Sequence, residues 1–340
     1  MTQVHFPVPE DSAGQRLDEF LAARLGALSR IRIANLIAQG RTTVNLSAAH
    51  SGYRVAAGDR VTIALDDGPP TAMTPEAIPL AVIYEDDHLI VVNKPAGMLM
   101  HPNKGVKGGT LANALAYHLN REYFEKIGKI RLPAHGEAHS LIRPGLAHRL
   151  DKETSGLVVV AKTRHALSLL TRHFQRRLVE KRYLALLRGR LRADAGSISA
   201  PIGRAPDRRP HWRVMESGKP AETRFRVLER GERTTLVELE PVTGRTNQLR
   251  IHCAYRGHPI VGDKLYSGEW ESGGAGEQEA DSGISNSGFE ISNERAAILP
   301  PCPATRLCLH AYRLAFHHPM GGQWMKFTSA LPPEMLSAAH

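Results

Sequence analysis

The 340-residue sequence lacks most features of a secreted or membrane protein. It has only three cysteines and no C-x-x-C pair, and an odd number of cysteines in a chain without a secretory signal indicates reduced thiols. No apolar run approaches the roughly 18 residues that a membrane-spanning helix needs. The start, MTQVHFPVPEDSAG, has neither the basic residues nor the apolar stretch of a signal peptide. We therefore expect a cytoplasmic protein with no membrane partner.

Acidic residues are scarce relative to basic ones, and the formal net charge is +10. Residues 267–295 hold seven acids and one base, a net charge of −6, which leaves +16 on the rest of the chain. Residues 162–192 alone hold ten bases and one acid. Such clustering favours a polyanionic partner, because neutralising phosphates releases counterions and steers association. A solvated basic helix face is the alternative, but the charge favours RNA or DNA.

The first 66 residues predict a small separate module. Apolar residues recur at helical spacing at Leu17, Phe20, Leu21 and Leu25. Ser29 can cap a second helix, and Gly40 can end it. The segment AAGDRVTIAL then has a Gly-Asp turn followed by alternating apolar residues, which is typical of a strand. We expect a compact helix-helix-strand unit over residues 1–66.

Basic residues gather in the second half of this module. Residues 29–60 carry one acid and five arginines, at positions 30, 32, 41, 54 and 60. The pattern R-L-D-x-F-L, S-R, I-x-x-G-R, V-N and G-D-x-V resembles the small RNA-binding module shared by a small-subunit ribosomal protein and bacterial tyrosyl-tRNA synthetases. The resemblance covers about residues 14–66. It implies that RNA is bound by Arg30, Arg32 and Arg41.

A proline-rich segment follows the module. Four prolines within residues 67–79 preclude regular structure and predict a stiff linker, and hence a domain boundary. Short strand-like runs predominate in residues 80–340, where RVLERGERTTLVELE has two apolar runs around a polar turn, as in a hairpin. Helices are predicted near 164–179 and from Thr246 onward. We expect an α+β domain with a mixed, mostly antiparallel sheet and peripheral helices.

One segment of this domain lacks the periodicity needed for packing. Residues 267–295 are rich in Gly, Ser and Glu, a composition that buries too little apolar surface to fold. We expect a disordered surface insertion there.

The stretch LAHRLDKETSGLVVVAKT, residues 146–163, places charged and hydroxyl side chains directly before an apolar strand. A strand leaving a turn is a rigid support, so polar residues at its start can be held over a cleft. Asp151 is the candidate nucleophile or base in this stretch. A single loop aspartate is more often a turn former or helix cap, so the residue type by itself leaves both interpretations open.

The pattern H-R-L-D-x-x-T-S-G-L-x-x-x-A-K in this stretch resembles the signature of the RluA-type pseudouridine synthases. Further matching segments are LIVVNKPAGMLMHP at 89–102, KRYLAL at 181–186, GRTNQLRIHCAYRGHPIVGDKLY at 244–266 and LCLHAYRLAFHHP at 307–319. The resemblance spans most of residues 80–325. One departure is Asn247, which stands where we expect His in most relatives.

The resemblance implies an isomerase that acts on uridines in RNA. Pseudouridine formation breaks the bond from ribose to N1 of uracil and rejoins the base through C5, with no redox change, so neither a cofactor nor a metal is expected. Asp151 would be the catalytic carboxylate, either attacking the anomeric carbon or taking a proton from the sugar. The target nucleotide would be flipped out of its helix at a cost of a few kcal/mol.

The resemblance also implies roles for residues around Asp151. Arg149 would fill the gap that the flipped nucleotide leaves, Tyr183 would stack on uracil, and Arg250 would pair with Asp151. Without the resemblance, Tyr183 fits a sheet aromatic equally well, and Arg250 fits a surface helix arginine. Further candidates for the pocket wall or for substrate contacts are His148, Thr154, Leu249, Ile251, Lys94 and Arg245.

Two other functions are compatible with parts of the sequence. A metallohydrolase is one, from His135 and His139 or from the group Cys302, Cys308 and His310, but Gly136 stands where a zinc protease helix needs Glu. A noncatalytic RNA-binding or ribosome-assembly factor is the other. It would share the positive charge and the N-terminal module, yet binding alone would not need Asp151, Tyr183 and Arg250 together.

The RNA class follows from the module rather than from the catalytic motif. An added RNA-binding module favours structured large-subunit ribosomal RNA over transfer RNA as the substrate. We expect the protein to act as a monomer.

Overall fold

The computed structural model describes most of the chain, namely residues 2–25, 28, 30–65, 74–103, 105–128, 142–206, 211–267 and 306–336. Ser29, part of the predicted linker and nearly all of the predicted insertion lie outside these residues. No helix in the described ranges is both long and apolar enough to cross a membrane.

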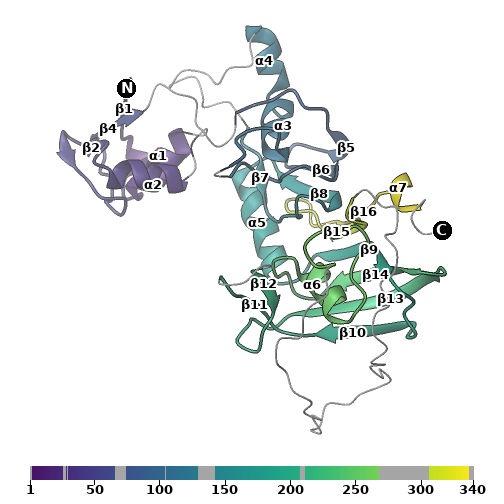
Figure 1. Cartoon of the computed structure of the whole chain (residues 1–340). Helices are drawn as coiled ribbons and strands as arrows, with labels where there is room; N and C mark the ends of the chain where they lie inside the picture. The colour runs from purple at the N-terminus through teal and green to yellow at the C-terminus, as the bar shows by residue number, and fades with distance from the viewer. Residues whose placement is uncertain are drawn as a thin grey trace.

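The N-terminal residues form a four-stranded antiparallel sheet packed against two helices. The sheet order is β1-β4-β2-β3, in which the strands are β1 (Thr2–Pro7), β2 (Thr42–Val44), β3 (Ser47–Ala48) and β4 (Arg60–Leu65). The helices are α1 (Leu17–Arg24) and α2 (Arg30–Ala38), and the short 3-10 helix η1 (Glu10–Ser12) precedes them. Figure 1 shows this body beside the rest of the chain.

The two predicted helices of this body and the predicted strand, which is β4, are confirmed, and three further strands complete the sheet. β1 pairs with β4 along its whole length, and Phe6 lies opposite Val61. Both side chains are buried in a core built only from residues between Phe6 and Leu65. Closing this small core with the first residues of the chain explains why they form a strand rather than a tail.

Ten strands of the remaining chain form one mixed sheet. Its main path is β10-β13-β14-β9-β15-β8-β6-β5, with β16 on β15 and β7 on β8. The bounds are β5 (Ala81–Glu85), β6 (Leu89–Lys94), β7 (Gly145–Leu146), β8 (Ser155–Ala161), β9 (Glu180–Arg188), β10 (Ala195–Ser199), β13 (Glu222–Arg230), β14 (Thr234–Pro241), β15 (Leu309–His317) and β16 (Trp324–Thr328). Within the described residues only β15 and β8 pair in parallel. The predicted α+β class with a mostly antiparallel sheet is confirmed, as is the hairpin β13-β14.

The remaining elements cover this sheet or extend from it. They are a two-stranded sheet of β11 (Ile202–Arg204) and β12 (Trp212–Val214) and the helices α3 (Leu111–His118), α4 (Arg121–Ile127), α5 (Arg164–Gln175), α6 (Gln248–Tyr255) and α7 (Pro333–Leu336). The helix predicted near 164–179 ends earlier, at Gln175, because Arg177 adopts a left-handed conformation with φ of 58°. A left-handed residue cannot continue a right-handed helix.

Strand β8 lies inside the sheet and is buried along its entire length. Leu157 and Val159 pack toward Leu170 of α5, while Val158 and Val160 pack toward Leu115 of α3. A strand covered on both faces is apolar throughout rather than alternating, which accounts for the run LVVV. The loop at residues 151–154, which leads into β8, is therefore anchored to a strand that is fixed in the core.

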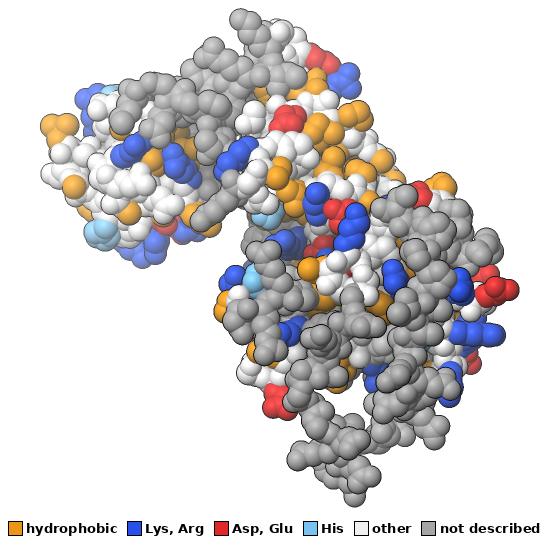
Figure 2. Space-filling view, in the orientation of Figure 1, with side chains coloured by type: hydrophobic (Ala, Val, Ile, Leu, Met, Phe, Trp, Pro, Cys, Tyr) orange, Lys and Arg blue, Asp and Glu red, His pale blue; other side chains and the backbone are white. Residues whose placement is uncertain are grey.

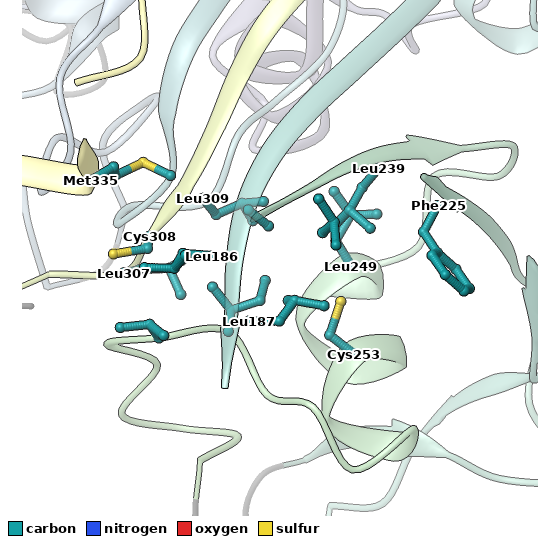
Figure 3. Close-up of a cluster of buried hydrophobic side chains, with 14 of the residues drawn as sticks. Leu186, Leu187, Phe225, Leu239, Leu249, Cys253, Leu307, Cys308, Leu309 and Met335 are labelled. Carbon is teal, nitrogen blue, oxygen red and sulfur yellow. The ribbon is translucent and has the colours of Figure 1, made fainter. Parts of the chain in front are cut away.

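Helix α6 packs on the other half of the sheet. Figure 3 shows Leu249 and Cys253 of α6 among side chains of the sheet, including Leu187 of β9 and Leu239 of β14. This cluster is the largest apolar core in the described chain that touches the helix. It fixes the N-terminus of α6 relative to β9.

We predict that Gly156→Ala destabilises the protein strongly. Gly156 has φ of +122°, and a Cβ there would lie 2.3 Å from the carbonyl oxygen of Ala311 in the neighbouring strand β15. Because that neighbour is backbone, we expect a loss of about 3 kcal/mol in the free energy of unfolding, measured by urea denaturation. Gly105→Ala is the matched control, since its nearest neighbour would be 3.7 Å away, and should be close to neutral. Equal stabilities would contradict the close strand contact at Gly156.

Candidate active site

A pocket of about 560 Å³ lies where three segments distant in the sequence meet. The segments are the loop before β8 (147–154), the end of α5 with the start of β9 (174–183), and the chain leading into α6 (241–250). Eight of the predicted site residues line this pocket: His148, Arg149, Asp151, Thr154, Tyr183, Arg245, Leu249 and Arg250. The fold therefore brings the predicted group together.

Asp151 contributes a partly accessible carboxylate, with 27% of its side chain exposed. Its backbone carbonyl accepts a hydrogen bond from the amide of Thr154 at 3.2 Å, which closes the turn before β8. Burial raises the pKa of Asp151, while the positive charges of Arg250 and Arg149 oppose this shift. A carboxylate with a raised pKa is a stronger base than a solvated one.

Arg250 makes its strongest contacts with a carboxylate other than the predicted one. Its Nε and Nη2 donate to the two oxygens of Asp263 at 2.7 and 2.8 Å. Nη1 lies 4.0 Å from Oδ2 of Asp151, so the predicted pair exists only as a longer contact. The Asp263 side chain is fully buried, and a buried carboxylate needs such a charged partner. Asp263 was not among the predicted site residues, and its one signal in the sequence was its place in the segment VGDKLY.

Tyr183 lies on β9 between Leu239 of β14 and Ala311 of β15. Burial and the negative charge of Asp151 both raise the pKa of its hydroxyl, so the ring stays neutral. A neutral aromatic ring on the pocket wall offers a surface on which a flat base can stack.

His148 holds the loop in place. Its Nε2 accepts a hydrogen bond from the backbone amide of Val159 at 3.1 Å, and its ring stacks on Phe174 at 4.5 Å. Burial, with a smaller effect of Lys181, lowers the pKa of His148 to about 3, which keeps the ring neutral. Nearby, the buried hydroxyl of Thr154 has no hydrogen-bond partner within the described chain.

Lys94 and Ile251 do not line the pocket, contrary to the prediction. The Lys94 side chain is buried, and its ammonium donates to the carbonyls of Pro95, Met98 and Lys152 at 2.8, 2.9 and 3.1 Å. It therefore joins two loops instead of contacting a phosphate, and burial lowers its pKa to about 8. Ile251 points into a core cluster with Ile202.

Basic side chains surround the pocket. Arg149 is exposed, and Arg177, Lys181 and Arg245 also line the pocket. Lys181 stands two residues before Tyr183 on β9, so strand alternation alone places both on one face, a signal that the sequence analysis did not use. On the face seen in Figure 2, Lys and Arg side chains occur on both the N-terminal body and the rest of the chain.

The three predicted arginines of the N-terminal body differ in their surroundings. Arg30 forms ion pairs with Asp18 and Glu19 at 3.1 and 3.2 Å, and 55% of its side chain remains exposed. Arg32 is exposed on α2, and Arg41 is partly buried before β2.

The residues considered for a metal are not assembled in the described part of the chain. No three His, Cys, Asp or Glu side chains lie close enough there to hold an ion. His135, His139 and Cys302 fall outside the described residues. His310 instead contacts Ser155 and Ser329, at 2.8 and 2.7 Å.

Comparisons with known proteins identify the family to which the chain is similar. A family profile described as RNA pseudouridylate synthase matches residues 88–255, which include all three pocket segments. The ribosomal large subunit pseudouridine synthase D of Nitrosomonas europaea is 38% identical over 333 residues, covering 98% of this chain and 86% of that protein. The ribosomal large subunit pseudouridine synthase C of Vibrio parahaemolyticus is 32% identical, covering 98% and 95%. The structure of human RNA pseudouridylate synthase domain containing 1 has a TM-score of 0.52 at 26% identity, covering 77% of this chain and 89% of that one.

We predict that Arg250→Ala lowers the free energy of unfolding by about 3–5 kcal/mol, because it leaves the buried Asp263 carboxylate without its cation. The double variant Arg250→Ala, Asp263→Asn should recover part of this loss in urea denaturation, since it removes the unpaired charge. Arg224→Ala breaks a surface pair with Glu222 at 3.3 Å and should cost less than about 1 kcal/mol. An Arg250→Ala variant as stable as this control would show that Asp263 does not need the pair.

Proposed function

The chain belongs to the RNA pseudouridine synthase family, and from this premise we propose that it isomerises specific uridines of large-subunit ribosomal RNA to pseudouridine, with Asp151 as the catalytic carboxylate. The observation that carries the proposal is the meeting of Asp151, Tyr183 and Arg250 in one pocket ringed by basic residues. The names of the relatives support ribosomal RNA of the large subunit as the substrate.

The reaction needs a carboxylate close to the sugar. The bond between C1′ of ribose and N1 of uracil breaks, the base turns, and C1′ bonds to C5, which gives up its proton while N1 takes one up. Asp151 either attacks C1′ or removes a proton from the sugar, and both routes need its ionised form. Arg250, held by Asp263, places one guanidinium nitrogen 4.0 Å from this carboxylate and favours that form.

The pocket wall suits a flipped uracil. The neutral ring of Tyr183 provides a stacking surface, and base-on-ring stacking contributes roughly 1–3 kcal/mol. That energy offsets part of the few kcal/mol that flipping costs. Arg149 is exposed two residues before Asp151, where it can enter the stack vacated by the nucleotide.

Basic side chains account for the affinity of the protein for RNA. Arg177, Lys181 and Arg245 at the pocket meet the phosphates near the target, and the N-terminal body adds Arg32 and its neighbours as a second contact. A noncatalytic RNA-binding factor would use the same charges but would have no need for a carboxylate aimed into an aromatic-walled pocket. Transfer RNA is the alternative substrate, and comparing the two RNAs as substrates separates them.

We predict that Asp151→Asn abolishes pseudouridine formation while RNA affinity falls less than about tenfold, because a carboxylate repels the phosphates of RNA if anything and so contributes no attraction to lose. Tritium release from 5-tritiated uridine in RNA measures turnover, and filter binding measures affinity. Glu153→Gln is the matched control in the same loop, since Glu153 is about half exposed and forms a surface pair with Lys152 at 3.7 Å. Turnover by the Asn variant at the level of this control would remove Asp151 from the mechanism.

We also predict that removing residues 1–66 leaves a folded enzyme with weaker RNA binding. The core of the N-terminal body is its own, and the pocket residues all lie beyond it. The truncated protein should keep activity on a short uridine-containing RNA, lose efficiency on long RNA, and show a shallower salt dependence of binding. Circular dichroism checks folding. Equal efficiency and equal salt slopes for both proteins would exclude the N-terminal body from substrate recognition.

A further inference from the structure

Asn247 occupies an unusual backbone position at the edge of the pocket. It precedes α6 as its N-cap residue, yet its φ and ψ of 54° and 20° are left-handed and its side chain makes no capping hydrogen bond. Asn tolerates this conformation better than most residues other than Gly. The side chain is thus released from the usual N-cap role and lines the pocket instead.

The amide of Asn247 lies between three polar groups. With its nitrogen toward Asp151, the nitrogen is 2.9 Å from Oδ2 and 3.3 Å from Oδ1, and the amide oxygen accepts from the hydroxyl of Tyr266 at 3.0 Å. In the opposite orientation the nitrogen donates to Tyr266 at 3.0 Å, and Nη1 of Arg250 donates to the amide oxygen at 3.3 Å. That oxygen would then face both oxygens of Asp151.

The charge on Asp151 decides between these orientations. An amide oxygen against an ionised carboxylate places two acceptors in contact. This repulsion outweighs the 3.3 Å contact with Arg250 and the 3.1 Å hydrogen bond that the single hydroxyl proton of Tyr266 otherwise donates to the carbonyl of Trp212. The nitrogen therefore faces Asp151 whenever the carboxylate is ionised. The reverse orientation fits the protonated acid, whose hydroxyl can donate to the amide oxygen.

Other groups leave this role open to Asn247. The two shortest hydrogen bonds of Arg250 go to Asp263, and its nearest approach to Asp151 is 4.0 Å. The ammonium of Lys94 is engaged by three carbonyls. With its nitrogen toward Asp151, the amide of Asn247 is within 2.9 Å of the carboxylate, closer than Arg250.

We propose that Asn247 is a positioning residue for Asp151, whose amide donates to the carboxylate, aims it into the pocket and stabilises its ionised form. The inference rests on the proposed function, in which Asp151 acts as a carboxylate. A neutral amide suits this site because it has both a donor and an acceptor, so Tyr266 can fix its far end while the nitrogen serves Asp151. A charge-assisted hydrogen bond of this kind stabilises the ionised carboxylate of Asp151 and lowers its pKa.

Asn247→Gly is the informative variant, because Gly keeps the left-handed backbone and removes only the amide. We expect kcat to fall about tenfold to a hundredfold with KM for RNA changed less than about threefold, as for one lost hydrogen bond to a charged group. Ionised Asp151 is lost as pH falls through its pKa, so the acid limb of the kcat profile should move to higher pH by about one unit. Asn247→Asp, which keeps the shape but replaces the donor with a charge, should move the limb further.

Asn45→Gly is the matched control. Asn45 also has a left-handed backbone, with φ of 50°, and its amide donates to the carboxylate of Asp59 at 2.8 Å in the N-terminal body. This variant removes an equivalent bond far from the pocket and should leave the acid limb unmoved. A shift as large as that of Asn247→Gly would mean that the effect is general destabilisation.

A direct titration separates this inference from the proposed function. Carbon-13 NMR of aspartate carboxyl groups in the free protein, with Asp151 assigned from Asp151→Asn, should give a higher pKa in Asn247→Gly than in the wild type. An unchanged pKa and unchanged kcat would overturn the role of Asn247 while leaving the activity intact. A wild type without pseudouridine formation would overturn the proposed function, and the titration would still decide the contact. If the Gly variant does not fold, Asn247→Asp provides the same titration.

Discussion

The buried carboxylate of Asp263 is the constraint on which the pocket depends. With no exposure to water it must keep a cation, and Arg250 satisfies it with two short hydrogen bonds. This pairing fixes the guanidinium, and with it the first turn of α6, against the loop after that helix. Arg250 is thus left with one nitrogen facing Asp151 at 4.0 Å, close enough for its charge to act but too far for a direct bond.

The opposite wall of the pocket is fixed by a different means. Strand β8 is buried on both faces, and the turn at residues 151–154 follows from its position. Two hydrogen bonds to the carbonyl of Lys152 hold this turn. One comes from the ammonium of Lys94, and the other comes from the amide of Gly97 at 2.9 Å. Backbone groups that would otherwise be buried without partners are satisfied in this way. A catalytic loop held by backbone contacts needs little reorganisation when the substrate enters.

The site contains two carboxylates and several basic side chains, whose charges affect one another. Two carboxylates, Asp151 and Asp263, share one guanidinium, so Arg250 cannot fully neutralise both. Burial and Asp263 raise the pKa of Asp151, and the surrounding arginines lower it. The amide of Asn247 supplies a hydrogen bond without adding charge, which leaves the basic residues at the rim for phosphates. In the proposed mechanism, the residues that meet the RNA are therefore different from those that control the carboxylate.

The sequence by itself determined the fold class and the hairpin β13-β14, because these depend on local periodicity. Contiguous motifs singled out Asp151, Tyr183 and Arg250 as candidate site residues. Tertiary structure decided what each polar side chain touches. β15 lies between β8 and β9 in the sheet, so the loop before β8, the start of β9 and the start of α6 meet only after the sheet forms. For that reason the sequence could not show that Lys94 is buried against backbone carbonyls, that Arg250 pairs with Asp263, or that Asn247 lies beside Asp151. Hydrogen-bond geometry is set by the arrangement of segments in space, and no residue pattern along the chain specifies it.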